Sequence, residues 1–141
     1  MTTYVLDSSA LLRYIDDEAG ADRVEEIFGA CVAGQADVHI SAMQWGEVAG
    51  NLRKRLGASH EVRIMSSLLP TECEIVPASG ERAVRAAGIK VDRKVAYADA
   101  FAIELAMDSS GHILVTADYD FKEVADLAKI EFLPPKLVLP I

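Results

Sequence analysis

The segment Tyr4-Val5-Leu6-Asp7-Ser8-Ser9-Ala10-Leu11-Leu12 holds a short apolar run, an acid, two serines and a second apolar run. Tyr4, Val5 and Leu6 favour a buried β-strand, and a serine can accept hydrogen bonds from the free amides of a helix that follows. Asp7 is therefore expected at the carboxyl end of a strand, beside the start of a helix. In open α/β sheets ligands bind at that edge. The alternative is that Asp7 only caps the helix.

Short strands and amphipathic helices alternate along the rest of the chain. The pattern predicts strands at 3–6, 38–40, 73–76, 112–115 and 130–133. It predicts helices at 9–16, 21–33, 42–56, 59–69, 80–87, 95–108 and 118–127, with a basic loop at 89–94 and an irregular tail at Pro134, Pro135 and Pro140. Ser41 and Gln44 are placed to form a capping box. Strands separated by helices imply an α/β fold, with a mostly parallel sheet of four or five strands flanked by helices on both faces.

Length and composition fit one soluble domain over 1–141. The sequence has 51% hydrophobic and 26% charged residues, and no apolar run approaches the roughly 20 residues that span a bilayer. Cys31 and Cys73 lack metal or redox spacing, and no leader-like segment begins the chain. A cytoplasmic protein with reduced thiols is expected. His39, His60 and His112 also lack ligand spacing and are expected to be structural or solvated.

The net charge of −8 argues against a nucleic-acid partner, because phosphates repel an acidic surface. The charge is uneven, however, and basic residues gather in the middle of the chain. Arg53-Lys54-Arg55 ends a predicted helix, where the helix dipole favours cations. Five others precede the 95–108 helix and are candidates for phosphate contacts, with a solvated surface as the alternative: Arg82, Arg85, Lys90, Arg93 and Lys94.

Asp99 lies within an apolar stripe of the 95–108 helix. Burial of an unpaired carboxylate costs several kcal/mol, so Asp99 is expected to be protonated, paired or bound to a metal ion. The alternative is a structural aspartate held by an amide or an arginine. Glu104 lies near the opposite side of the helix and is expected to be solvated.

Three further acids lie in contexts that suggest a functional role. Glu47 lies off the apolar stripe of the 42–56 helix, between Gly46 and Gly50, and each glycine costs a helix about 1 kcal/mol relative to alanine. Asp118 and Asp120 follow the predicted strand 112–115, and either of them could instead be a helix cap.

These acids can meet at one edge of a parallel sheet. Two carboxylates 4 Å apart repel by about 4 kcal/mol at an effective dielectric of 20, so four of them require cations. A site made only of oxygens suits Mg²⁺ or Mn²⁺, and such sites cleave phosphodiesters. A phosphohydrolase with an aspartyl intermediate would require an acid where Ser9 stands.

Four places in the sequence form one pattern: Leu6-Asp7-Ser8-Ser9-Ala10-Leu11, Glu47, Tyr97-Ala98-Asp99-Ala100 and the run Thr116 to Phe121. Together they resemble PIN-domain ribonucleases, most of all the VapC toxins of toxin–antitoxin pairs. The resemblance implies a PIN-like fold and a metal-dependent endoribonuclease that acts on RNA. It implies that Asp7, Glu47, Asp99 and Asp118 hold Mg²⁺ or Mn²⁺, with support from Ser8, Thr116 and Asp120, and it leaves open whether Asp118 or Asp120 is the fourth acid. A homodimer and a cognate antitoxin are implied as well. The alternative is a PIN fold that binds RNA or a protein partner without cleaving.

Overall fold

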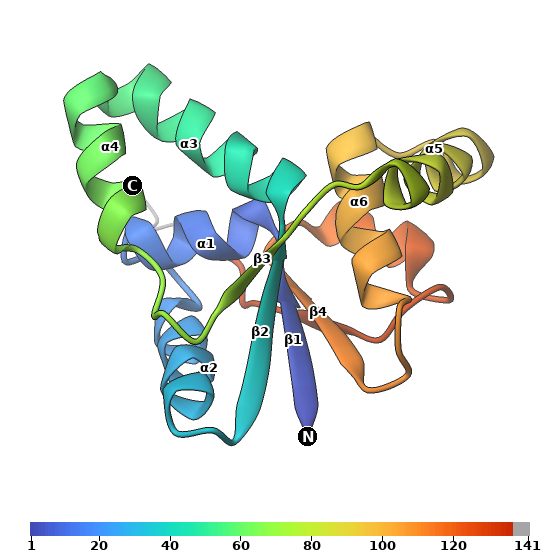
Figure 1. Cartoon of the computed structure of the whole chain (residues 1–141), viewed down its shortest axis with the longest axis horizontal. Coiled ribbons are helices and arrows are strands. Elements are labelled where there is room, and N and C mark those ends of the chain that lie inside the picture. Colours follow the sequence, from blue (N-terminus) through green and yellow to red (C-terminus); the bar gives the residue numbers. More distant parts are fainter. Residues whose placement is uncertain (137–141) are drawn as a thin grey trace, which may run out of the picture.

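The computed structural model describes residues 1–136 and contains one parallel sheet with the strand order β3-β2-β1-β4-β5 (Figure 1). Its strands are β1 (Thr2–Leu6), β2 (Ala36–Ser41), β3 (Glu74–Val76), β4 (His112–Thr116) and β5 (Ile130–Phe132). The α-helices are α1 (Ser8–Ile15), α2 (Ala21–Val32), α3 (Ala42–Leu56), α4 (Ala58–Ser67), α5 (Gly80–Arg93) and α6 (Tyr97–Ala106). A 3₁₀ helix, η1 (Tyr119–Val124), precedes β5. The predicted α/β class, with a parallel sheet flanked by helices, is confirmed.

Alternation along the strands divides the core between the two faces of the sheet. On one face, Leu6 of β1 and Val115 of β4 pack with α1, α2 and α3. On the other, Val5 and Leu114 pack with α6 and η1. Successive side chains of a strand point to opposite faces, so neighbouring residues of one strand serve both layers. Helices therefore cover the sheet on both sides, as Figure 1 shows.

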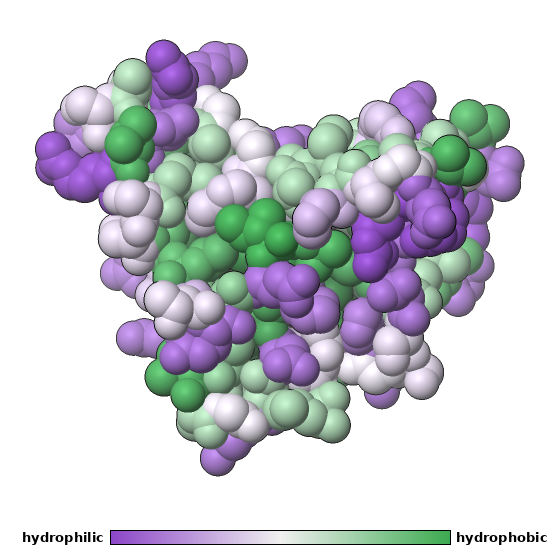
Figure 2. Space-filling view, viewed as in Figure 1, coloured by the Kyte–Doolittle hydropathy of each residue, from purple (hydrophilic) through white to green (hydrophobic). Residues whose placement is uncertain are grey.

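The central strand is β1, which pairs with β2 on one side and with β4 on the other. Parallel pairing brings the carboxyl ends of all five strands to the same edge of the sheet. Asp7 and Ser41 lie at or just after two of these ends, and Thr116 is the last residue of β4. The polar residues that follow each strand thus share one edge. Above this edge the surface is hollowed between the α3–α4 pair and the α5–α6 pair (Figure 2).

The predicted basic loop at 89–94 was wrong, because α5 continues through Gly88 to Arg93. A glycine inside a helix costs only about 1 kcal/mol. That cost is offset here by Ile89, which packs against the core, and by Arg93, which forms an ion pair with Asp126. Lys94 then ends the helix in the left-handed conformation, with φ of 55°. Other boundaries also shift: α6 spans Tyr97–Ala106, and the predicted 118–127 helix is the shorter η1. Pro140 lies outside the described residues.

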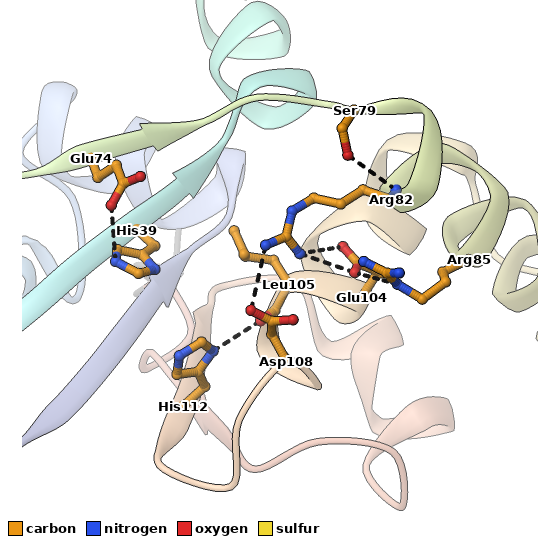
Figure 3. A network of polar contacts seen from close by, with 9 residues as sticks. All are labelled: His39, Glu74, Ser79, Arg82, Arg85, Glu104, Leu105, Asp108 and His112. Carbon is orange, nitrogen blue, oxygen red and sulfur yellow. Dashed lines mark hydrogen bonds and ion pairs between the residues drawn. The ribbon is translucent and has the colours of Figure 1, made fainter.

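The prediction that Glu104 is solvated was also wrong. Its side chain is 4% exposed and lies between α6 and α5, where two arginines hold it (Figure 3). Arg82 Nη1 lies 3.0 Å from each carboxylate oxygen, and Arg85 Nε lies 2.9 Å from Oε1. Arg82 also contacts Asp108 at 3.4 Å. This buried ion cluster fixes α5 against α6, and it occupies two of the arginines that the sequence offered for RNA.

Arg82→Met should therefore destabilise the fold, because the buried Glu104 would keep only the half-exposed Arg85 as a partner. Loss of one partner of a buried pair costs about 3–5 kcal/mol, and the remaining arginine should reduce this to roughly 2–3 kcal/mol. Urea unfolding measures the change. Lys90→Met on the same helix is the control and should stay within about 0.5 kcal/mol of the parent protein. Equal losses in the two variants would contradict the role assigned to Arg82.

Candidate functional site

Asp7 follows β1 directly and is 2% exposed. It is the N-cap of α1, because its Oδ1 accepts hydrogen bonds from Ala10 N at 2.9 Å and from Ser9 Oγ at 2.7 Å. Its Oδ2 accepts from Thr116 Oγ1 at 2.6 Å. Burial raises the pKa of Asp7 to about 6, although these three hydrogen bonds act in the opposite direction. The cap is thus real, but it leaves a buried carboxyl group whose charge lacks a counterion.

Ser9 and Thr116 join the ends of β1 and β4. Ser9 Oγ accepts from Ala117 N at 2.8 Å and lies 3.1 Å from Thr116 Oγ1. Thr116 Oγ1 in turn accepts from Asp118 N at 3.0 Å. The supporting role predicted for Thr116 fits these contacts, since it touches Asp7 and also sets the backbone of Asp118. Ser9 was not among the predicted site residues, and a serine beside an acid carries no distinctive sequence signal.

Gln44 connects the other side of the site and was also missed. The predicted capping box with Ser41 does not form: Ser41 caps α3 through Met43 N, while Gln44 is fully buried and points across the site. Gln44 Oε1 accepts from Ser8 N at 2.6 Å, and its Nε2 donates to Ala98 O at 2.7 Å. One turn further along α3, the exposed Glu47 accepts from Ser8 Oγ at 3.2 Å. A single amide therefore ties α1, α3 and α6 together.

Asp99 lies half-buried in the first turn of α6. Its pKa is raised to about 6, first by desolvation and then by repulsion from Glu47, Asp118 and Asp120, while a hydrogen bond from Gln44 lowers it. Repulsion from Asp99 also contributes to the raised pKa of Asp7. These mutual effects show that the predicted acids converge on one region.

Asp118 and Asp120 follow the end of β4. Asp118 Oδ1 accepts from Asp120 N at 2.9 Å and caps η1, and Asp120 is exposed. Asp118 is the less exposed of the two, and its amide is held by Thr116. Both repel Asp99, so the structure leaves two candidates for the fourth acid.

An all-carboxylate cluster with raised pKa values has the donor chemistry for a hard divalent cation. Within residues 1–136, no three acidic, histidine or cysteine side chains are close enough to bind one ion together. Mg²⁺ keeps several water ligands and commonly binds proteins through one or two carboxylates, so a hydrated ion suits this spacing. The uncompensated charge at Asp7 and Asp99 is the observation that makes the residues fit such an ion.

The five basic candidates divide into two groups. Arg82 and Arg85 pair with Glu104, and Arg93 pairs with Asp126. Lys90 and Lys94 are exposed and form no ion pair within the described part of the chain, and Lys94 lines the same cavity as Asp99. Of the five candidates, these two lysines therefore present unpaired charge, and the exposed Lys122, two residues after Asp120, is a further cation near the acids.

Gln44→Leu keeps the approximate volume but leaves Ser8 N and Ala98 O unsatisfied. The variant should lose about 2–4 kcal/mol of unfolding free energy, since two buried groups lose their partners. The Asp99 carboxyl, without its hydrogen bond, should titrate at a higher pH than in the parent protein. Urea unfolding and carboxyl NMR titration measure the two effects. An unchanged Asp99 titration would show that Gln44 does not act on the acids.

Asp7 and Asp99 also predict how the stability of the metal-free protein depends on pH. Each carboxyl has a folded pKa of about 6, against 3.8 as the ordinary value, so the folded state binds the proton more tightly. The resulting stability is present at low pH and is lost as the pH rises from about 4 to about 6. In EDTA, the Tm of the parent protein should fall over this range, and Asp99→Asn should reduce the fall. If the Tm of the two proteins fell equally with pH, Asp99 would not be a source of this pH dependence.

Comparisons with known proteins agree with this architecture. The family model for the PIN domain matches residues 4–127. Among solved structures, VapBC2 from Rickettsia felis bound to a promoter DNA fragment matches with a TM-score of 0.73 and 14% identity, over 94% of this chain and 100% of that one. VapC20 from Mycobacterium tuberculosis, a toxin that cleaves the sarcin–ricin loop, matches with a TM-score of 0.68 and 19% identity, over 93% of this chain and 99% of that one.

DNA-bound VapBC from Salmonella typhimurium matches with a TM-score of 0.70 and 16% identity, over 94% of this chain and 98% of that one. No curated protein matches the sequence. The identities are low, so these structures establish a shared fold, while the family model covers most of the sequence. This chain belongs to the PIN domain family.

Proposed function

We propose that this protein is a metal-dependent endoribonuclease that hydrolyses RNA phosphodiester bonds as the toxin of a toxin–antitoxin pair. The observation that carries the proposal is the convergence of Asp7, Glu47, Asp99 and Asp118 at the carboxyl edge of the sheet, where burial and mutual repulsion raise the pKa of two of them. Membership of the PIN family and a fold shared with VapC structures support the nuclease and toxin assignments.

Asp7, Glu47, Asp99 and Asp118 would hold hydrated Mg²⁺ or Mn²⁺, with water supplying the ligands that the spacing of the acids leaves open. When bound, such an ion activates water and offsets the charge that develops on the phosphoryl oxygens. Asp7 contributes a carboxylate whose rotamer is fixed by Thr116, Ser9 and Ala10. Ser8 steadies Glu47, and Asp120 is placed to assist at the rim. Water is the attacking group in this proposal, since the hydroxyls of Ser8, Ser9 and Thr116 hold Glu47 and Asp7 in place through hydrogen bonds.

The partners are proposed from the same comparisons. Several of the matched structures are toxin–antitoxin complexes, which supports a cognate antitoxin as the regulator of this chain. Homodimer formation and a cytoplasmic location are proposed on the family likeness. Within residues 1–136, none of the helices has both the length and the apolar character that a membrane crossing requires.

The test uses purified protein, free of any co-purified partner, with a mixed RNA panel in Mn²⁺, Mg²⁺ or EDTA. We expect cleavage that EDTA abolishes, and Asp99→Asn should lose roughly 100-fold or more of the rate. Asp37→Asn is the matched control, since Asp37 is exposed on β2 and lies away from the carboxyl edge. It should cleave like the parent protein. Growth arrest on expression of the parent protein, but not of Asp99→Asn, would extend the result to toxicity.

Two results would contradict the proposal. Cleavage by Asp99→Asn at the rate of the parent protein would exclude the catalytic role proposed for Asp99. No cleavage by a folded, partner-free parent protein in either metal would favour a PIN fold that binds RNA or protein without cutting.

A further inference from the structure

A cavity of about 530 Å³ opens directly beside the acids. Asp99 and Asp120 line it, and Val95, Phe121 and Val124 supply apolar wall. Arg93 and Lys94, at the C-terminus of α5, line it as well. The volume is within the range of ordinary ligand pockets, roughly 300–1,000 Å³. A strand of RNA with a phosphate near Asp99 could therefore place its neighbouring nucleotide in this cavity.

Arg93 lines the cavity, but its guanidinium is already paired. Its guanidinium contacts Asp126 Oδ1 at 2.6 Å and Oδ2 at 3.0 Å, and it donates to Glu123 O at 3.0 Å. These contacts clamp the end of α5 to η1 and the turn after it. The clamp neutralises Arg93 and at the same time fixes the backbone of the next residue, Lys94.

Lys94 has two properties that its neighbours lack. It is exposed at the cavity and forms no ion pair within residues 1–136. It also has a φ of 55°, a left-handed conformation that helices usually assign to glycine at this position. A side chain with a Cβ costs about 1–2 kcal/mol there. Unfavourable backbone conformations of this kind concentrate at functional sites, where a side chain must point in one direction.

We propose that Lys94 is a phosphate-binding residue of the RNA site, and that the cavity beside Asp99 holds the nucleotide adjacent to the bond that is cut. The proposal rests on the proposed ribonuclease function and names one contact within it. Lysine binds phosphate as a point charge without reading the base, so this contact adds affinity that is independent of sequence. The acids that line the same cavity, including the exposed Glu123, repel the phosphates of RNA, so an unpaired cation here matters more than it would on a neutral surface.

The backbone conformation of Lys94 allows a test that separates function from stability. Lys94→Gly removes the ammonium group and relieves the left-handed strain. Its Tm should therefore equal or exceed that of the parent protein, while RNA binding weakens. Binding is measured by fluorescence anisotropy with a labelled single-stranded RNA octamer of mixed sequence, in EDTA, over a series of salt concentrations. We expect roughly 3- to 10-fold weaker binding, and a slope of log K against log salt that is lower by about 0.7, the value for one lost phosphate contact.

Three variants control for other effects. Asp17→Gly relieves the other left-handed non-glycine residue, at φ of 51° and remote from the acids, and should retain the salt slope. Lys54→Ala removes one positive charge at the end of α3 and should also retain it. Lys94→Arg keeps the charge and should bind like the parent protein. In Mn²⁺, Lys94→Gly should raise the KM for RNA cleavage by a similar factor and leave kcat near that of the parent.

The outcomes distinguish this proposal from the one on which it rests. A parent protein that cleaves RNA, with Lys94→Gly equal to it in affinity, salt slope and KM, would overturn the phosphate site alone. An equal loss of affinity in Lys54→Ala would also overturn it, because the effect would then be one of net charge. A parent protein that neither binds nor cleaves RNA would overturn both proposals together.

Discussion

The buried carboxyl group of Asp7 is the constraint around which the structure is arranged. It ends the central strand, caps α1 and accepts the hydroxyl of Thr116 from β4. Burial of such a group without a counterion is costly, so its hydrogen bonds have to be supplied completely. Ser9, Ala10 and Thr116 supply them, and in doing so they fix the relative positions of β1, α1 and β4. The same contacts that make this acid tolerable therefore also build the edge of the sheet.

Gln44 performs the equivalent task on the opposite side. Its neutral amide can donate one hydrogen bond and accept another, and it accepts from Ser8 N and donates to Ala98 O. A negatively charged side chain at this place would add to the repulsion that already raises the pKa of Asp99. The site thus combines several negative charges with a neutral scaffold, and its remaining charge is open to a cation from solution. Arginine instead compensates the buried Glu104, away from this edge, on the helix pair that α5 and α6 form.

The sequence predicts much of this because the relevant signals are local. A buried strand that ends in an acid identifies Asp7 and the Thr116–Asp118 pair, and parallel topology then brings them together. Signals that depend on tertiary contacts are not visible in the sequence. Glu104 looked solvated because its partners are 19 and 22 residues away. Gln44 matched a capping box, although its real partners lie on other helices. Gly88 looked like a helix end, but the packing of Ile89 and the Arg93–Asp126 pair extend α5 beyond it.

The strand order has a consequence for how the chain folds. β1 and β2 pair early in the sequence, but β4 joins the central strand only after more than a hundred residues have been made, and the Thr116–Asp7 bond spans 109 positions. Such distant contacts are slow to form, because the entropy of closing the intervening loop is lost before they contribute stability. A nascent chain that ends before β4 already carries Asp7, Glu47 and Asp99, yet it lacks the strand that orders the first of them. The assembled acidic edge is therefore a late product of synthesis and folding.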